Sequence, residues 1–263
     1  MSNTKKISWE VSQFHGDVRS QKQEVVATEF PLTVIVNGEE FATMVCSPSH
    51  LKELIVGFLA SEGIIRHYDE LLSLDIDETQ GFAYVEINKP IKQQDHSKRF
   101  IGSCCGKSRQ FYFKSDVKTA KTIRNKISLT ATQCYNLMGQ LQLQSNSFHI
   151  TGGVHNAALC NVEQVLAIRT DIGRHNALDK LYGDILIKQI PLHDKVIAFS
   201  GRVSSEVLLK ISKIGIGILL SKSAPTDLAL QLANDLGITV IGFIRGKKMN
   251  VYTNAWRIKE NEQ

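Results

Sequence analysis

Two adjacent cysteines, Cys104 and Cys105, are the most distinctive chemical feature of the sequence. Their α-carbons must lie about 3.8 Å apart, which is shorter than an ordinary disulfide requires, so a structural bridge between them is disfavoured. Lys107 and Arg109 follow the pair, and nearby positive charge lowers the pKa of a thiol and favours the thiolate. We therefore predict a reactive thiolate suited to group transfer, with two ordinary free thiols as the alternative.

The other three cysteines, Cys46, Cys134 and Cys160, lie in apolar patterns and are expected to be core thiols. An odd number of cysteines at irregular spacing is typical of free thiols in a reducing compartment. The sequence contains no Cys-x-x-Cys, and its His and Cys residues are not clustered at the spacing of zinc ligands. No metal site is predicted.

Four polar segments follow predicted strands in the second half of the chain. They are Asp171–Asp179, Ser200–Glu206, Lys222–Asp227 and Phe243–Lys248. In open α/β sheets, ligands bind at the carboxyl ends of the strands. Glycines let the backbone approach a ligand, helix N-termini direct N–H groups at anions, and Arg or Lys supplies charge. Together the four segments predict a site for a phosphate or pyrophosphate. The alternative is that each segment is ordinary loop chemistry.

Asp171, Arg174 and His175 could form an acid–base cluster, because a histidine titrates near neutral pH. The alternative is that Asp171 caps a helix and takes part in a structural ion pair. His155 lies in the glycine turn Thr151–Asn156, and for it a buried, hydrogen-bonded role is an equal alternative.

The elements that must position these residues fall into two groups. In the first half, β-branched alternation around Asn37-Gly38 predicts a hairpin over residues 30–46, and a second hairpin is expected over residues 72–88. Between them, Ser47 as N-cap and Pro48 as first residue predict the start of a helix that ends at Gly63. Residues 1–28 are expected to be loosely ordered.

In the second half, strands and helices alternate, which predicts a largely parallel sheet covered on both faces. A capping box at Thr130 and Gln133 begins the first helix, and the boundary between two domains, 1–128 and 129–263, is placed just before it. The expected strands cover 165–169, 196–199, 217–220 and 238–243, and the further helices 176–190, 205–214 and 226–236.

Composition limits the class of protein. The chain has 263 residues, of which 43% are hydrophobic and 22% charged, and this excludes a disordered or disulfide-scaffold protein. The net charge of +5 is too mild for a dedicated nucleic-acid binder but suits a ligand with a few negative charges. Because neither a targeting signal nor a membrane-spanning stretch is visible, a cytoplasmic location is expected.

The motifs resemble the formate dehydrogenase accessory sulfurtransferase family, FdhD. The resemblance extends from about residue 28 to 256 in the order of the family. The matching segments are Thr28–Leu32, Gly57–Gly63, Cys104–Lys107, Thr151–Ala157, Asp171–Lys180, Ser200–Glu206, Lys222–Thr226 and Gly242–Arg245.

The resemblance implies a sulfur carrier required for formate dehydrogenase activity. Such a protein accepts persulfide sulfur from a cysteine desulfurase and transfers it to the bis-molybdopterin guanine dinucleotide molybdenum cofactor before insertion. The resemblance also implies a homodimer, and a three-layer, cytidine deaminase-like C-terminal domain beside a smaller mixed α/β N-terminal domain. GDP is expected to bind as an analogue of half the cofactor. Neither nucleic acid nor membrane is an expected partner.

Cys104 and Cys105 are the implied catalytic residues, and the family's cofactor-binding segment matches Phe243–Lys248. The full set of implied cofactor-binding residues is Asp171, Arg174, His175, Gly201, Arg202, Lys222, Ser223, Phe243, Ile244, Arg245, Gly246, Lys247 and Lys248.

Two departures from the family pattern matter. Many members carry Cys-x-x-Cys where this chain has adjacent cysteines, so either Cys104 or Cys105 could carry the persulfide. The zinc-binding motifs of deaminases are also missing, because His155-Asn-Ala157 replaces a His-x-Glu and the second half has no Pro-Cys-x-x-Cys. The likeness to deaminases should therefore concern the fold alone. A chaperone that delivers the cofactor without sulfur chemistry is the alternative function.

Overall fold

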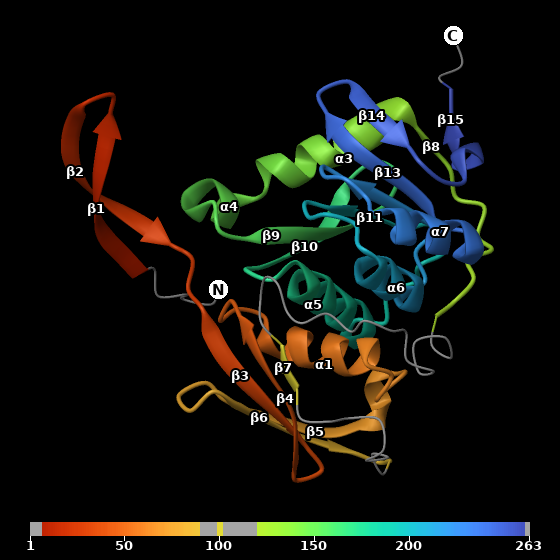
Figure 1. The fold of residues 1–263 in the computed structure, drawn as a ribbon. Helices are drawn as coiled ribbons and strands as arrows, with labels where there is room; N and C mark the ends of the chain where they lie inside the picture. The colour runs from red at the N-terminus through yellow and green to blue at the C-terminus, as the bar shows by residue number, and fades with distance from the viewer. Residues whose placement is uncertain (1–6, 90–98, 102–119, 261–263) are drawn as a thin grey trace.

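The computed structural model describes residues 7–89, 99–101 and 120–260 of the chain. Figure 1 shows a six-stranded sheet with helices on both faces, a five-stranded sheet beneath it, and a two-stranded arm that stands apart from both. The expected α/β class is confirmed. The cytidine deaminase-like layout and the division at residue 128 stay predictions.

The five-stranded sheet carries the two hairpins expected in the first half. It comprises β3 (Phe30–Val36), β4 (Glu39–Cys46), β5 (Leu71–Asp77), β6 (Phe82–Ile87) and β7 (Arg99–Ile101), in the order β5-β6-β3-β4-β7. Asn37 and Gly38 both have positive φ angles, which a tight two-residue hairpin turn requires. The side chains of Leu32, Val34 and Val36 share one buried face of the sheet.

Helix α1 (Leu51–Ser61) covers that face but begins later than expected. Its N-cap is His50, not Ser47. Ser47 is engaged elsewhere, because its backbone N–H donates to Asp171 Oδ2 at 2.9 Å and its hydroxyl accepts from the backbone N–H of Ile172. The tertiary contact therefore takes the capping groups away from the helix.

The six-stranded sheet is mixed, where a largely parallel one was expected. Its strands are β9 (His155–Cys160), β10 (Val165–Asp171), β11 (Val196–Phe199), β12 (Ile218–Ser221), β13 (Thr239–Arg245) and β14 (Lys248–Val251), in the order β10-β9-β11-β12-β13-β14. Only the pairs β11–β12 and β12–β13 are parallel, and the other three pairings are antiparallel. The short connections after β9 and β13 permit hairpins alone, since a parallel neighbour needs a longer crossover.

Helices cover both faces of this sheet, as expected. One face packs against α3 (Ala131–Leu143), which begins with the predicted Thr130–Gln133 capping box and continues to the short helix α4 (Asn146–Thr151). The other face packs against α5 (Arg174–Ile187), α6 (Ser205–Ile214) and α7 (Asp227–Leu236). Alternate residues of one strand supply the two faces, with Ala198 on the α3 side and Ile197 on the α5 side.

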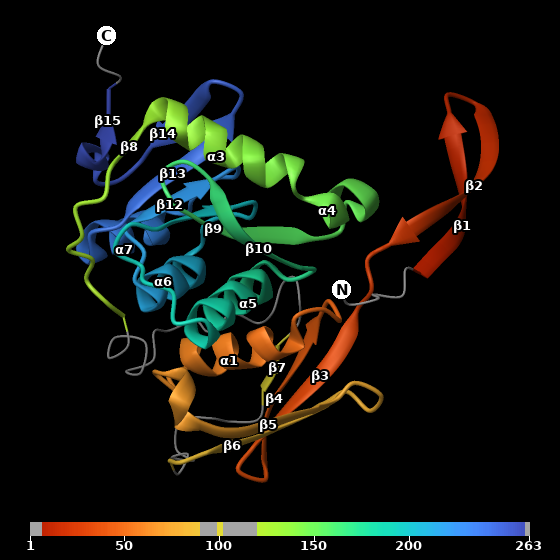
Figure 2. The ribbon, with the colours of Figure 1, turned by 180° about the vertical axis from the view of Figure 1, so that it is seen from behind.

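The ends of the described chain form smaller elements. Residues 7–26, expected to be loosely ordered, form the antiparallel arm of β1 (Ile7–His15) and β2 (Val18–Val26), which Figure 2 shows from behind. At the other end, β15 (Ile258–Lys259) pairs in parallel with β8 (Leu129–Thr130). The 3-10 turns η1 (Tyr68–Glu70) and η3 (Ala255–Arg257) complete the elements.

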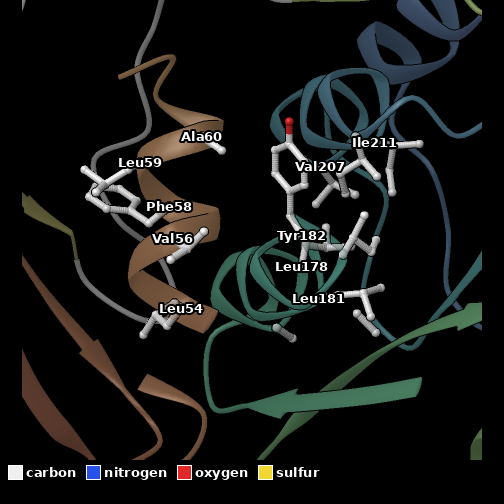
Figure 3. Close-up of a cluster of buried hydrophobic side chains, with 14 of the residues drawn as sticks. Leu54, Val56, Phe58, Leu59, Ala60, Leu178, Leu181, Tyr182, Val207 and Ile211 are labelled. Carbon is white, nitrogen blue, oxygen red and sulfur yellow. The ribbon is translucent and has the colours of Figure 1, made fainter. Parts of the chain in front are cut away.

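One hydrophobic core connects the two sheets through helices α1 and α5. Figure 3 shows Val56 and Ala60 of α1 on the side toward α5, whereas Phe58 and Leu59 point away from it. A Cβ on Gly57 would lie 1.8 Å from the carbonyl oxygen of Asp179, and a Cβ on Gly183 would lie 1.9 Å from that of Glu53. The two helix backbones are therefore in direct contact, and only glycine fits at either position.

We expect Gly183→Ala to destabilise the fold by about 2–3 kcal/mol, because overpacking forces the helices apart. Gly139→Ala is the matched control, since nothing lies within 4 Å of a Cβ at this helical glycine. It should be neutral or stabilise the protein by up to about 1 kcal/mol. Urea unfolding measures both changes. Equal unfolding midpoints for Gly183→Ala and the unchanged chain would contradict the close contact.

Candidate functional site

Strand pairing brings the predicted polar segments to one edge of the six-stranded sheet. Asp171 pairs with His155, so the end of β10 lies beside the beginning of β9. Phe199 pairs with Ser221, so β11 and β12 end side by side. Helices α5, α6 and α7 begin directly after these strand ends, and their N-termini lie at the same edge. The shared edge is the feature that the sequence predicted.

Hydrogen bonds connect the loops at this edge into one rigid unit. The backbone N–H of Val203 donates to Ala224, and that of Thr226 donates back to Val203. The N–H of Phe243 donates to the carbonyl of Ser223, which links the segment Phe243–Lys248 to the segment Lys222–Asp227. Gly201 is buried here, and a Cβ on it would lie 2.9 Å from the ring of Phe199. The packing of the Phe199 ring therefore requires glycine at position 201.

The segment Phe243–Lys248 is a cationic turn between β13 and β14. Phe243 is exposed and has φ +52°, an unusual backbone conformation for a bulky residue and one that is concentrated at functional sites. The guanidinium of Arg245 lies 5.9 Å from the centre of the Phe243 ring. Lys247 and Lys248 are also exposed, whereas Ile244 is buried in the core and anchors the turn.

Two predicted residues of the neighbouring loops, Arg202 and Lys222, differ in exposure. Arg202 is exposed, while Lys222 and Ser223 are half-buried, and all three follow the ends of β11 and β12. Their cationic groups and backbone N–H groups add to those of the cationic turn. An anion of several charges could therefore be bound at this edge.

Asp171 is fully buried and holds the two sheets together. Its carboxylate accepts from the backbone N–H groups of Ser47 and Gly173, and from the side-chain amide of Asn176. The ammonium of Lys180, also fully buried, lies 2.6 Å from it. The structure thus supports the ion-pair alternative, whereas the N-cap of α5 is Gly173 and not Asp171. A ligand could reach Asp171 only if this cluster opened.

His175 lies apart from Asp171 and next to Glu206. The imidazole Nε2 is 3.3 Å from Glu206 Oε2 but makes no hydrogen bond, and Arg174 Nε is likewise buried without a partner. Burial, together with the positive charges of Lys210 and Arg174, lowers the pKa of His175 to about 3. Burial also lowers the pKa of His155. Both imidazoles are therefore neutral near pH 7, and the low pKa of His175 makes it a weak base.

Glu206 is the residue of this edge that sequence reasoning did not single out. It belongs to the polar segment Ser200–Glu206 and lies in the first turn of α6. Because acidic residues are favoured in the first turn of any helix, its position alone did not indicate a functional role. Only the fold shows that it faces His175, from a helix 31 positions further along the chain.

Cys104 and Cys105, with Lys107 and Arg109, lie outside the described residues. The three described cysteines are the expected core thiols: Cys46, Cys134 and Cys160 are all buried. Burial raises the pKa of each to about 12, which keeps them protonated and unreactive.

Within residues 7–89, 99–101 and 120–260, no three His, Cys, Asp or Glu side chains gather so as to hold a metal ion. None of the helices in these segments is long and apolar enough to cross a membrane.

The pKa of His175 predicts a pH-dependent stability. In the unfolded chain this imidazole binds a proton as the pH falls through about 6.5, while in the folded chain it stays neutral down to about pH 3. The unfolded state therefore gains protons that the folded state does not, and stability falls as the pH drops from about 6.5 toward 3.

We expect His175→Gln to flatten this dependence of stability on pH. His193→Gln, at an exposed histidine, should leave the slope as it is. Urea unfolding from pH 7 to pH 5 measures the slope, and identical slopes for the two variants would contradict a buried neutral His175.

Comparison with known proteins matches nearly the whole chain to one family. The model of the FdhD/NarQ family matches residues 27–259. A protein of Bacillus pumilus named sulfur carrier protein FdhD is 58% identical over 252 residues, which cover 95% of this chain and 96% of that protein. A protein of Bacillus subtilis with the same name is 55% identical over 254 residues, 96% of each chain.

A solved structure shows the same fold. It is a crystal structure from Desulfotalea psychrophila, provisionally named a formate dehydrogenase accessory protein. It is 25% identical, covers 97% of this chain and 99% of its own, and superposes with a TM-score of 0.79. From these matches and the motif order we conclude that the chain belongs to the FdhD/NarQ family.

Proposed function

We propose that this protein is a sulfur carrier required for formate dehydrogenase activity and that it acts through a cysteine persulfide. The relatives named sulfur carrier protein FdhD, more than half identical over nearly the whole chain, support the general role. The observation that carries the chemical part of the proposal is the course of β7, which runs toward the edge of the six-stranded sheet where the candidate site lies and precedes the cysteine pair in the sequence.

Strand β7 ends at Ile101, beside Met44 of β4, and the two strands run in the same direction. Strand β4 ends at Cys46, and the backbone N–H of the next residue, Ser47, donates to Asp171 at the edge of the six-stranded sheet. Cys104 follows Ile101 by three residues, and three residues span at most about 11 Å. The chain therefore leaves β7 on the side of the molecule where the candidate site lies.

In the proposed reaction, a cysteine desulfurase loads a sulfur atom onto Cys104 or Cys105. A persulfide is more acidic than a thiol, so the loaded sulfur is anionic and is stabilised by cations such as Lys107 and Arg109. In the transfer, the cofactor would supply an electron pair for a new bond to the outer sulfur, while the sulfur–sulfur bond breaks and its electron pair leaves with the cysteine as a thiolate. The buried thiols Cys46, Cys134 and Cys160 take no part, because burial keeps them protonated.

The proposed acceptor is the bis-molybdopterin guanine dinucleotide molybdenum cofactor, bound as cargo at the sheet edge. Its pyrophosphates suit the exposed cations Arg202, Arg245, Lys247 and Lys248 and the first-turn N–H groups of α5 and α7, whose N-caps make no side-chain hydrogen bond. Phe243 offers an exposed aromatic ring beside them. The neutral imidazole of His175 lies at the same edge and could form a hydrogen bond with the cargo.

The remaining parts of the proposal concern partners and place. We include a cysteine desulfurase as donor, formate dehydrogenase as the recipient of the cofactor, a homodimer and a cytoplasmic location. The helices on both faces of the six-stranded sheet are consistent with a cytidine deaminase-like layout.

The sulfur-carrier proposal is tested at the cysteines. After incubation with a desulfurase and cysteine, the peptide that contains Cys104 and Cys105 should gain about 32 Da, the mass of one sulfur atom. Cys104→Ala or Cys105→Ala should abolish sulfur transfer while nucleotide binding persists. Cys134→Ala, at a buried thiol, is the matched control and should load normally. If the double variant still yields active formate dehydrogenase in cells that lack any other copy, a delivery chaperone replaces the carrier.

The cofactor site is tested with GDP as the probe. We expect GDP to bind, and Arg245→Ala to weaken its binding by about 1.5–3 kcal/mol through loss of a charge-assisted hydrogen bond. Arg66→Ala removes an exposed arginine next to the five-stranded sheet and should leave the affinity as it is. Isothermal titration calorimetry measures both. An unchanged affinity in Arg245→Ala would remove this residue from the site.

A further inference from the structure

Strand β14, at one edge of the six-stranded sheet, presents an exposed face with a cation, an amide and an aromatic ring. Met249 and Val251 pack against the core on the α3 side of the sheet. Because side chains alternate along a strand, Lys248, Asn250 and Tyr252 lie on the opposite face, and all three are exposed. The backbone N–H of Tyr252 still donates to β13, so the pairing of the two strands continues one residue beyond β14.

The ring of Tyr252 is held against β13 and the loop before α7. A Cβ on Gly242 would lie 3.0 Å from Tyr252 Cε2 and 3.0 Å from the carbonyl oxygen of Ser223. It would also lie 3.2 Å from Cδ of Pro225. A side chain at position 242 would therefore displace the ring, and the ring lies close to the segment Lys222–Asp227.

The hydroxyl end of the same ring is held as well. The side-chain amide of Asn250 donates to the Tyr252 hydroxyl at 3.3 Å. Tyr252 is nevertheless 36% exposed, so part of its ring faces solvent. A side chain that is fixed before a ligand arrives loses little entropy when the ligand binds. Tyr252 is thus a preformed aromatic surface for a flat ligand group.

The position of Tyr252 relates it to the anion-binding groups of the candidate site. Pro225, beside the ring, directly precedes Thr226, the N-cap of α7, whose side chain makes no capping hydrogen bond. Lys248 shares the exposed face of Tyr252. A ligand that joins a flat aromatic group to a phosphate chain therefore finds partners for both parts here.

Phe243 is the other exposed aromatic residue of this hairpin, and it belongs to the cationic turn. The guanidinium of Arg245 lies 5.9 Å from the centre of its ring, within the range of a cation–π contact. A base that stacked on Phe243 would compete with this guanidinium. The surroundings of the two rings therefore favour Tyr252 as the stacking surface.

We propose that the guanine base of the cofactor stacks on the ring of Tyr252, while its phosphates bind Lys248 and the N-terminus of α7. A nucleobase suits this surface because its flat π face stacks on aromatic side chains. Tyr252 is then a ligand-binding residue outside the segment Phe243–Lys248. The inference rests on the cofactor site of the proposed function and adds recognition of the base to recognition of the phosphates.

Calorimetric titration of GDP into the full chain tests the stacking. We expect Tyr252→Leu to weaken GDP binding about 5- to 150-fold, which corresponds to the contribution of about 1–3 kcal/mol that one stacked base makes. Tyr252→Phe keeps the ring and should bind GDP within about threefold of the unchanged chain. Tyr84→Leu is the matched control, because Tyr84 is 44% exposed on β6 of the five-stranded sheet, and it should leave the affinity unchanged. Unchanged urea unfolding midpoints show that each variant folds.

Inorganic pyrophosphate separates stacking from phosphate binding. It carries the phosphates of GDP without a base, and its affinity is measured by competition with GDP. Tyr252→Leu should leave the affinity for pyrophosphate as it is, because no base is present to stack. Arg245→Ala should weaken the binding of both ligands.

Proton NMR of bound GDP reports the stacking directly. In the unchanged chain, the H8 proton of guanine should shift upfield on binding, because the ring current of a stacked aromatic side chain shields it. This shift should persist in Tyr252→Phe and be lost in Tyr252→Leu.

Three results would overturn the proposal. If Tyr252→Leu binds GDP like the unchanged chain, the base does not stack on Tyr252, although the cofactor site itself stands. If Tyr252→Leu weakens GDP and pyrophosphate equally, the tyrosine supports the loops and does not contact the base. If GDP does not bind the unchanged chain, the cofactor site of the proposed function fails, and this inference fails with it.

Discussion

The arrangement of the whole molecule depends on the contact between helices α1 and α5. Gly57 and Gly183 let the two backbones touch, and any side chain at either position would collide with a carbonyl oxygen of the other helix. Because α1 covers the five-stranded sheet and α5 covers the six-stranded sheet, this one crossing merges their interiors into a single core. It also fixes where β4 ends, and with it the end of the neighbouring strand β7.

Buried charged groups flank this crossing and are all paired. At one end, Asp171 and Lys180 bond to each other and to the backbone of Ser47. At the other, Lys210 bonds to Asp179, which also accepts from Ser61, and Lys213 donates to the Ser61 carbonyl. A buried ion pair contributes little net stability, but removing one partner leaves an uncompensated charge. We infer that these groups hold the two sheets in a single orientation.

The site combines this rigidity with chemistry of two kinds. Hydrogen bonds between loops fix the edge of the six-stranded sheet, and its cations and helix N-termini favour an anionic ligand. Next to them, His175 is neutral because burial and the neighbouring positive charges disfavour its protonated form. The proposed sulfur-bearing cysteines follow a strand of the other sheet. The candidate edge and the strand β7 thus belong to different sheets, which the helix crossing holds next to each other.

Local patterns in the sequence determined the elements and the positions of the polar segments. Asn37-Gly38 defined a hairpin, Thr130 and Gln133 defined a helix start, and glycine- and serine-rich segments marked the strand ends, because each signal acts within a few residues. Tertiary structure alone decided the rest. The small residues Ala157 and Ala158 gave no alternation of polar and apolar side chains from which to predict β9. The polar composition of residues 7–26 likewise did not indicate the two strands of the arm. Asp171 is a buried structural residue because Ser47, 124 positions away, bonds to it, and Glu206 faces His175 only through the packing of α5 and α6. Contacts between distant parts of the chain depend on packing geometry, which no local pattern contains.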